Sequence, residues 1–338
     1  MANEKSKTEH AITIKEVARL AGVSSATISR YLNGKMNRMS KETADKIEKI
    51  IQDTGFVANA TARQLSTRNS QLVAVVAADI DDYFSTEFFK GASSVLEQNG
   101  LTAILFDSNS DKQRELTNLK IINHQVFDGL IIQPLINQYG ELRSLIRKGL
   151  RTIILDRDLH TDDWTTVKTN NYGISQQTAA YFRQQQFDDC VVVSEAIVGT
   201  STREDRLAGI RAIFPNASLI EIDNSRPFIK ENEKKALAMI AKNRAAKHKT
   251  LFFFLKERLL LAFFPTFMHH DLLSAPDIAI TAFSDTAIVK RLLPDSKLIK
   301  QDPFLMGATA AEILADRIKN QRTPNISSNR IVIPAKLQ

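Results

Sequence analysis

The chain has 338 residues, of which 43% are hydrophobic and 25% charged, a composition typical of a globular protein with an apolar core. No stretch reaches the ~18 uninterrupted apolar residues of a transmembrane helix, and the N-terminus lacks the apolar core of a signal peptide, so we expect a cytoplasmic protein. The net charge is +7, and residues 1–70 alone hold twelve basic and seven acidic side chains. This asymmetry favours a small basic module that binds a polyanion.

The N-terminal part predicts three short helices. Thr13 and Glu16 fit a capping box at the start of the first helix, which Gly22 ends. The second helix is expected over 24–32, followed by Asn-Gly, and the third over 40–55. Two helices joined by a glycine-containing turn are typical of a helix-turn-helix.

The second helix has one apolar and one polar face. Ile28 and Leu32 can pack inward, and small residues near the start allow a helix to lie deep in the major groove of DNA. Arg30 can donate two hydrogen bonds to guanine or contact a phosphate. The alternative is a three-helix packing module with a polar face. On the DNA-binding interpretation, the outward side chains are Ser25, Ala26, Ser29 and Arg30.

From residue 72 onward, apolar runs alternate with helical patterns. Continuous apolar runs indicate strands covered on both faces, and therefore mainly parallel sheets. Eight such units fit either one barrel or two doubly wound halves. The predicted strands are 72–78, 102–106, 129–133, 152–156, 190–193, 218–222, 251–255 and 278–283.

Ligands of open α/β sheets bind beyond the carboxyl ends of the strands. The polar and aromatic residues that follow the predicted strands therefore form the candidate site. An aromatic face with carboxylate and amide groups suits a sugar, and cations at the same positions suit an acidic group. The residues at these positions are Asp79, Phe84, Gln133, Asp156, Arg157, Lys256, Ser284 and Asp285.

Other features carry no enzymatic signature. The sequence lacks the common nucleotide-binding, hydrolase and zinc motifs, so we expect no enzyme, no cofactor and no metal. His269 and His270 are expected to face solvent, and the single cysteine, Cys190, to be a buried thiol. Trp164 could stack on a sugar or anchor a surface loop.

The stretch ITIKEVARLAGVSSATISRYLNG resembles, almost position by position, the headpiece of LacI-type transcriptional regulators. The resemblance continues through GFVANATARQLSTRNSQLVAVV and, more weakly, to the C-terminus; RYLNGKMNRMS is also similar to ketodeoxygluconate-type regulators of the family. It implies a helical headpiece over 1–58, a hinge helix and linker over 59–70, and a core over 71–338. The core would contain two interleaved, doubly wound parallel-sheet subdomains, like periplasmic binding proteins, with a ligand between them.

The resemblance also implies which residues contact DNA. Ser25 and Ala26 occupy the two variable specificity positions, and Leu65 matches a leucine that wedges into the minor groove. The family often has Arg-Pro before the hinge asparagine, where this chain has Val57-Ala58, so ordering of the hinge is in doubt. The implied set is Thr13, Ser24, Ser25, Ala26, Thr27, Ser29, Arg30, Asn33, Asn59, Ala62, Leu65 and Arg68.

In the core, the resemblance adds Arg206 to the candidate site. Lys168 joins it as a further cation at or next to a strand end that faces the cleft, and Gln301 completes the predicted set. Where the family usually carries Asn-Asp, this chain has Leu255-Lys256, and Ser284 replaces an aspartate. A cation therefore stands where a hydroxyl-binding group is usual. We expect an anionic effector, either a sugar acid such as gluconate or ketodeoxygluconate or a sugar phosphate. The alternatives are a neutral sugar or no small effector.

Together these features predict a repressor of carbohydrate or sugar-acid catabolic genes. Two headpieces of a homodimer would read a pseudo-palindromic double-stranded operator, and the effector would change closure of the subdomains and ordering of the hinge. The chain ends at RIVIPAKLQ without apolar heptads, which favours a dimer over a tetramer. A free-standing sugar-binding module is the rival reading, and the headpiece argues against it.

Overall fold

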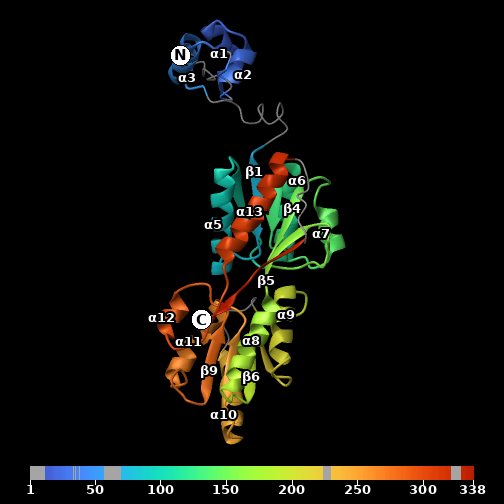
Figure 1. Ribbon diagram of the computed structural model, residues 1–338, viewed down its shortest axis with the longest axis vertical. Coiled ribbons are helices and arrows are strands. Elements are labelled where there is room, and N and C mark those ends of the chain that lie inside the picture. Colours follow the sequence, from blue (N-terminus) through green and yellow to red (C-terminus); the bar gives the residue numbers. More distant parts are fainter. Residues whose placement is uncertain are drawn as a thin grey trace, which may run out of the picture. The chain divides into compact units, whose positions relative to one another are not determined.

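The structure is a computed structural model of the whole chain (Figure 1). It describes residues 12–32, 34, 36–37, 39–56, 70–223, 230–320 and 329–338. These form two compact units, which meet in the sequence between Asn69 and Ser70. No helix of this described part is long and apolar enough to span a membrane.

The first unit contains the three expected helices. The capping box is present: Glu16 N–H donates to the Thr13 hydroxyl and Thr13 N–H to the Glu16 carboxylate. Gly22 then closes the first helix in the left-handed region at φ 72°. Ile28 and Ile47 are fully buried in a small core. The helices are α1 (Ile14–Ala21), α2 (Ser25–Leu32) and α3 (Lys41–Thr54).

The first lobe of the core unit is built on a six-stranded sheet in which every pair is parallel. Alternate residues of its strands enter two apolar clusters, one on each face: Val73 and Val75 pack on one side, Ala74 and Val76 on the other. This two-sided burial explains the continuous apolar runs. The strand order is β11 (Arg330–Ile333), β5 (Thr165–Thr169), β4 (Arg151–Leu155), β3 (Gly129–Ile132), β1 (Leu72–Ala77), β2 (Thr102–Asp107).

Helices cover both faces of this sheet. Helices α5 and α13 lie side by side on one face (Figure 1) and share its cluster. Helices α6 and α7 contribute to the cluster on the opposite face. The bounds are α5 (Tyr83–Gln98), α6 (Lys112–His124), α7 (Tyr139–Leu145) and α13 (Pro303–Asn320).

The second lobe repeats the pattern around a four-stranded parallel sheet. Phe252 and Phe254 face one cluster, and Leu251 and Phe253 the other. Its strands, in order, are β7 (Ser218–Ile222), β6 (Asp189–Glu195), β8 (Thr250–Phe254) and β9 (Ile278–Ala282). Its helices are α8 (Asn171–Gln184), α9 (Ser201–Arg211), α10 (Lys230–Ala245), α11 (Glu257–His269) and α12 (Ile288–Leu292).

The chain crosses between the lobes three times. It passes from β5 into α8, returns from β10 (Ile299–Lys300) into α13, and passes again from β11 to β12 (Lys336–Leu337), which pairs with β10. The eight predicted strands are all confirmed, and two doubly wound lobes replace the barrel alternative. Strands β5, β10, β11 and β12 were not predicted from the sequence.

Candidate DNA-binding helix and ligand pocket

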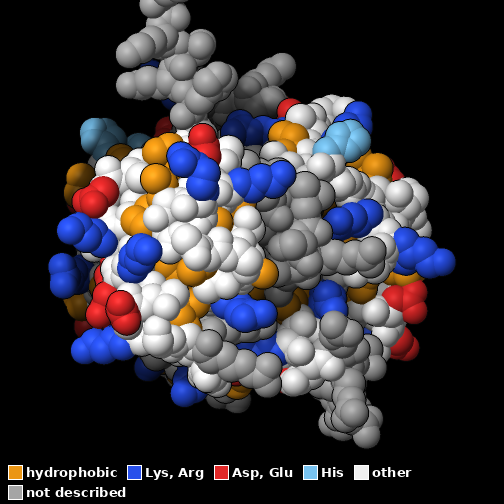
Figure 2. Space-filling view, turned by 90° about the horizontal axis from the view of Figure 1, so that it is seen from above, with side chains coloured by type: hydrophobic (Ala, Val, Ile, Leu, Met, Phe, Trp, Pro, Cys, Tyr) orange, Lys and Arg blue, Asp and Glu red, His pale blue; other side chains and the backbone are white. Residues whose placement is uncertain are grey.

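Helix α2 has the two faces that its sequence predicts. Ile28 is fully buried, and Leu32 and Val23 pack against the same core. On the other face, Ala26 and Arg30 are exposed. Figure 2 shows Lys and Arg side chains in the viewed direction, interspersed with acidic and apolar ones. The helix therefore presents a guanidinium beside a small, groove-compatible surface.

The remaining predicted DNA contacts fall into three groups. The hydroxyls of Thr13 and Ser24 serve as helix caps, because Glu16 N–H and Thr27 N–H donate to them. Ser25, Thr27 and Ser29 are half-buried on α2. The others lie outside the described residues: Asn33, Asn59, Ala62, Leu65 and Arg68.

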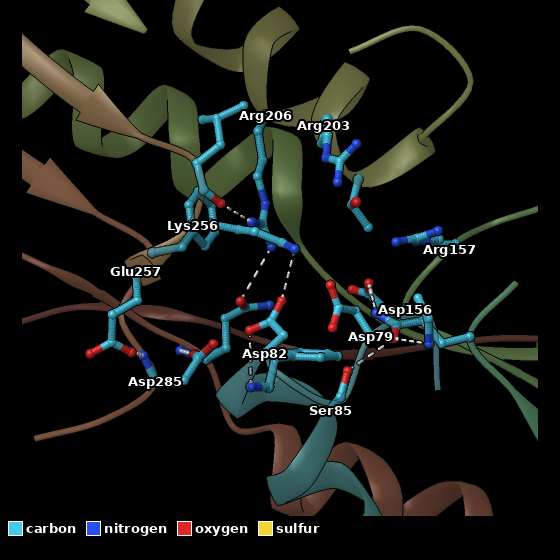
Figure 3. Close-up of a pocket in the computed structure, with 17 residues that line it drawn as sticks. Asp79, Asp82, Ser85, Asp156, Arg157, Arg203, Arg206, Lys256, Glu257 and Asp285 are labelled. Atoms are coloured by element: carbon cyan, nitrogen blue, oxygen red, sulfur yellow. Dashed lines mark hydrogen bonds and ion pairs between the residues drawn. The ribbon is translucent and has the colours of Figure 1, made fainter. Parts of the chain in front are cut away.

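A pocket of about 510 Å3, including its open mouth, lies between the two lobes of the core unit (Figure 3). Its walls come from the ends of β1, β3 and β4 in one lobe and from α9 and the ends of β8 and β9 in the other. It is lined by Ala78, Asp79, Asp82, Phe84, Ser85, Gln133, Asp156, Arg157, Thr202, Arg203, Arg206, Leu255, Lys256, Glu257, Phe283, Asp285 and Gln301.

The lining contains most residues of the candidate site. Two predicted residues lie elsewhere. Lys168 pairs with Asp158 at 2.9 Å, and the backbone of Ser284 donates to Ile299 O at 2.8 Å. Side chains alternate along extended backbone, so Phe283 and Asp285 line the pocket while Ser284, between them, does not. The predicted residues that line it are Asp79, Phe84, Gln133, Asp156, Arg157, Arg206, Lys256, Asp285 and Gln301.

Trp164, for which the sequence left two readings, is also outside this lining. It is 8% exposed and packs edge-on against Tyr139 with ring centroids 5.2 Å apart. It therefore anchors its loop to the core. His269 and His270 are exposed, and Cys190 is buried, as expected. Burial raises the pKa of the Cys190 thiol far above its ordinary value.

Arg206, on α9, is a buried cation on the second-lobe side of the pocket. Its guanidinium donates from Nε to Asn171 Oδ1 at 2.8 Å, from Nη1 to Leu255 O at 2.6 Å and from Nη2 to Gln301 Oε1 at 3.2 Å. It also lies 3.5 Å above the centre of the Phe283 ring. Arg206 is 7% exposed, so its position is set before any ligand arrives.

The first lobe presents a buried amide and carboxylate. Gln133 accepts from Ala78 N–H and the Ser85 hydroxyl, and it donates to Asp156 Oδ2 at 2.9 Å. Asp156 Oδ1, Arg157 Nε and Gln301 Nε2 are buried and have no hydrogen-bond partner within the described part of the chain. Buried polar atoms of this kind usually have a partner. Three residues of the lining thus hold two donors and one acceptor without a partner among the described residues.

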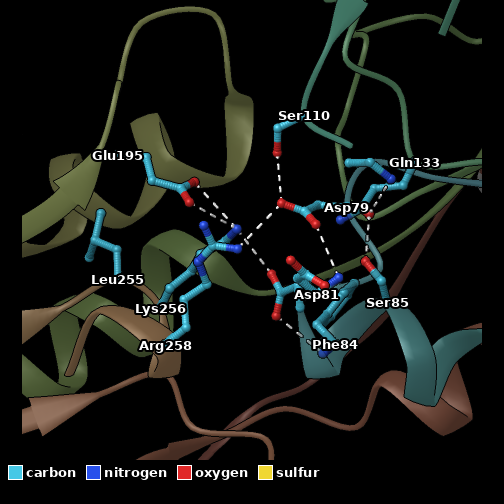
Figure 4. Close-up of polar contacts among 12 residues, drawn as sticks. Asp79, Asp81, Phe84, Ser85, Ser110, Gln133, Glu195, Leu255, Lys256 and Arg258 are labelled. Carbon is cyan, nitrogen blue, oxygen red and sulfur yellow. Dashed lines mark hydrogen bonds and ion pairs between the residues drawn. The ribbon is translucent and has the colours of Figure 1, made fainter. Parts of the chain in front are cut away.

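Lys256 joins the two lobes. Its Nζ lies 3.1 Å from Asp82 Oδ2 and 3.3 Å from Glu195 Oε2. Nearby, Arg258 Nη1 lies 3.4 Å from Asp79 Oδ2 (Figure 4). Burial raises the pKa of Asp82, but the charge and hydrogen bond of Lys256 outweigh it and hold that pKa below its ordinary value.

The sequence did not indicate Asp82, Ser85, Thr202 or Arg203 as site residues. They lie in the loop or first turn after a strand, rather than at the strand end. Asp82 did carry a local signal, because an aspartate just before an apolar helical pattern is a preferred N-cap. Its Oδ1 accepts from Phe84 N–H at 3.2 Å and caps α5.

Helices α5, α9 and α11 all begin at the pocket. Their N-termini place partial positive charge there. Several acids nevertheless line the same space, and Asp285 is one of them. Burial, with the neighbouring charge of Asp82, raises the pKa of Asp285 to about 7, and Arg206 offsets part of that effect.

We expect Asp285→Asn to make the free energy of unfolding less dependent on pH. Because the folded-state pKa of about 7 exceeds the ordinary 3.8, the folded chain binds this proton more tightly than the unfolded chain does. The wild type should therefore lose stability as pH rises from about 4 to about 7, and the variant should lose less over the same interval. Urea unfolding at a series of pH values measures both curves.

The exposed loop carboxylate Asp271 provides the control for this experiment. Asp271→Asn should give a curve parallel to that of the wild type. Parallel curves for wild type and Asp285→Asn would contradict the role assigned to Asp285.

Comparisons with known proteins agree with this geometry. Residues 13–59 match the family model described as "Bacterial regulatory proteins, lacI family". Over 326 residues the chain is 30% identical to the HTH-type transcriptional regulator KdgR of Bacillus subtilis, with 94% of each chain covered. A crystal structure of a LacI transcriptional regulator from Lactobacillus brevis is 36% identical, with a TM-score of 0.73, and covers 79% of this chain and 100% of its own.

A lac repressor dimer bound to operator and the anti-inducer ONPF shares the fold. The TM-score is 0.81 at 19% identity, covering 97% of this chain and 98% of the repressor chain.

Proposed function

Because the chain belongs to the LacI family of bacterial regulatory proteins, we propose that it is a sequence-specific DNA-binding regulator, and specifically a repressor of sugar-acid catabolic genes. A small effector bound between the lobes of the core controls it. The protein acts by binding rather than by catalysis.

The observation that carries this proposal is the exposed face of α2. Arg30 and Ala26 are exposed, whereas Ile28, on the other face of the same helix, is fully buried. A helix anchored by one face and basic on the other suits major-groove binding. A free-standing sugar-binding module would have no use for it.

We propose that the regulator is a homodimer that reads a pseudo-palindromic operator. Two-fold symmetry of the protein then matches that of the DNA. Both lobes expose large apolar side chains that such an interface can cover, among them Tyr83 and Ile104 in the first lobe and Ile288 and Leu292 in the second. Strand β2, which carries Ile104, also forms an edge of its sheet.

We propose a sugar acid as the effector, with gluconate and ketodeoxygluconate as the first compounds to examine. Arg157, Arg206 and Lys256 line the pocket, and Arg157 Nε is buried without an acceptor. A carboxylate supplies such acceptors. Gln301 Nε2 and Asp156 Oδ1, also unpartnered, suit the hydroxyls of the same molecule.

A gel-shift experiment with the full chain and the promoter regions of its own and adjacent genes tests the proposal. We expect a specific complex that survives competitor DNA and that gluconate or ketodeoxygluconate changes, whereas neutral sugars do not. Absence of specific binding at low salt would overturn the regulator. Response to a neutral sugar alone would overturn only the acidic effector.

Arg30→Ala should weaken operator binding by roughly 5- to 150-fold, because a bidentate contact to guanine contributes about 1–3 kcal/mol of discrimination. Fluorescence anisotropy with operator and with unrelated DNA measures the effect. Lys242→Ala removes an equal charge from exposed α10 in the core unit and should leave the affinity near that of the wild type. Equal losses on both DNAs would assign Arg30 to a phosphate instead.

A further inference from the structure

Among the described residues, two ion pairs connect the lobes across the pocket, and Lys168 with Asp205, 3.9 Å apart, forms a further pair outside the pocket lining. Both acids, Asp79 and Asp82, lie in the turn between β1 and α5, and both bases, Lys256 and Arg258, lie at the start of α11. Each lobe contributes its two partners from one short segment, so a single opening movement of the lobes breaks both pairs. A dashed line joins Lys256 to Asp82 in Figure 3, and another joins Arg258 to Asp79 in Figure 4.

The charges near Lys256 balance only while the lobes are together. Within its own lobe, Lys256 shares Glu195 with Arg203, which also contacts that carboxylate. Two cations then face one anion. Asp82, from the other lobe, supplies the missing negative charge. These side chains are 3–21% exposed, so solvent screens them less than it screens a surface pair.

Each oxygen of Asp82 has a separate role. Oδ1 caps α5 through Phe84 N–H, and Oδ2 points to Lys256 Nζ. An acidic group of a ligand that approached Lys256 would meet a position already held by a carboxylate oxygen. The pocket therefore does not present all three of the cations Arg157, Arg206 and Lys256 to a ligand, because Asp82 already occupies the anion position on Lys256.

We propose that Asp82 is a tethered counter-ion: it holds the cleft closed in the ligand-free protein, and the acidic group of the effector competes with it for Lys256. The first half concerns the ligand-free chain and is independent of effector identity. The second half rests on the proposed function. Asp82 is thus a specificity residue, because it sets how strong an anion must be to bind.

Spin labels on opposite sides of the cleft test the first half in the full chain. Lys112 and Val198 line a wider outer cleft from the first and second lobes, and Val198 is 90% exposed. Cysteines placed there react selectively, because Cys190 is buried. Pulsed electron resonance then gives the distribution of distances between lobes. We expect the ligand-free wild type to show mainly the short distance.

Asp82→Asn should shift the population toward the long distance, raising the open-to-closed ratio roughly fivefold or more. Asparagine retains the N-cap, so the change isolates the charge. Lys256→Met should have a similar effect, since Lys256 makes no side-chain cap of α11. The double variant should add little to either single change, because both remove one pair.

Glu87→Gln is the matched control. It breaks the Lys90–Glu87 pair of 2.5 Å, which lies within α5 in a single lobe. Its distance distribution should equal that of the wild type. Unchanged distributions for Asp82→Asn, or additive shifts in the double variant, would overturn the tethered counter-ion.

Calorimetry with D-gluconate and D-glucitol tests the second half, because these open-chain polyols differ mainly in a terminal carboxylate. Asp82→Asn should raise the preference for gluconate several-fold, and Lys256→Met should lower it. A lowered preference in Asp82→Asn would make Asp82 a ligand contact rather than a competitor. If the wild type binds neither probe, nor ketodeoxygluconate, the proposed effector class fails, and the distance measurement still decides whether Asp82 closes the cleft.

Discussion

Replacing Gly307 with alanine should lower the free energy of unfolding by about 3 kcal/mol, at the upper end of the usual range for overpacking. A Cβ at Gly307 of α13 would lie 1.9 Å from Phe88 O of α5, and a Cβ at Gly91 of α5 would lie 2.0 Å from Phe304 O. The obstructing atoms are backbone atoms, which no rotamer change can move. The two helices must separate, and the cluster beneath them then loses its packing.

Urea unfolding of the single and double variants measures this effect. Gly91→Ala should be similarly harmful, and the double variant should lose less than the sum, because one separation of the helices relieves both collisions. Gly173→Ala in α8, where an added Cβ meets nothing within 4 Å, should instead gain roughly 0.5–1 kcal/mol. A stable Gly307→Ala protein would contradict the close backbone contact.

The sequence predicted the helices that bury one apolar face and the strands that bury apolar side chains on both faces. Strand β1 is apolar throughout, and β8 is apolar after Thr250, because both faces of these strands are covered. Strand β5 is almost as fully buried, but its buried residues are largely threonines, and some of their hydroxyls hydrogen-bond to distant parts of the chain. Thr169, for example, donates to Ile333 O, 164 residues away along the chain. A pattern of hydrophobicity has no means of finding such a strand.

The site shows the same division. Asp79, Gln133 and Asp156 follow strands directly, so the strand-end rule finds them. Lys168 shows its limit: it is the fourth residue of β5, and its ammonium turns to Asp158, outside the pocket. Arg203 lies on α9, and its contact with Glu195 depends on how α9 packs beside β6. That packing is a tertiary property, which spacing along the chain does not encode.

Arg206→Met should both destabilise the core unit by about 3 kcal/mol and weaken gluconate binding at least about a hundredfold. The guanidinium holds acceptors from three elements: Asn171 on α8, Leu255 after β8, and Gln301 before α13. Methionine fills similar volume but leaves these acceptors without donors. Gln301 is then free to turn, and the pocket loses both one of its cations and the orientation of a second contact.

The loss of stability and the loss of gluconate binding are measured by different experiments, and a control variant accompanies both. Urea unfolding reports the lost hydrogen bonds. Calorimetry under conditions in which the variant is still folded reports the lost ligand contact. Arg211→Met changes the same residue type at the exposed end of the same helix and should alter neither. Arg206→Lys keeps the charge, but one ammonium cannot meet acceptors on three elements, so it should restore little stability. If Arg206→Met bound gluconate like the wild type while losing stability, Arg206 would be a structural strut between the crossing segments, and the acidic group would then have to be held by Lys256 and Arg157.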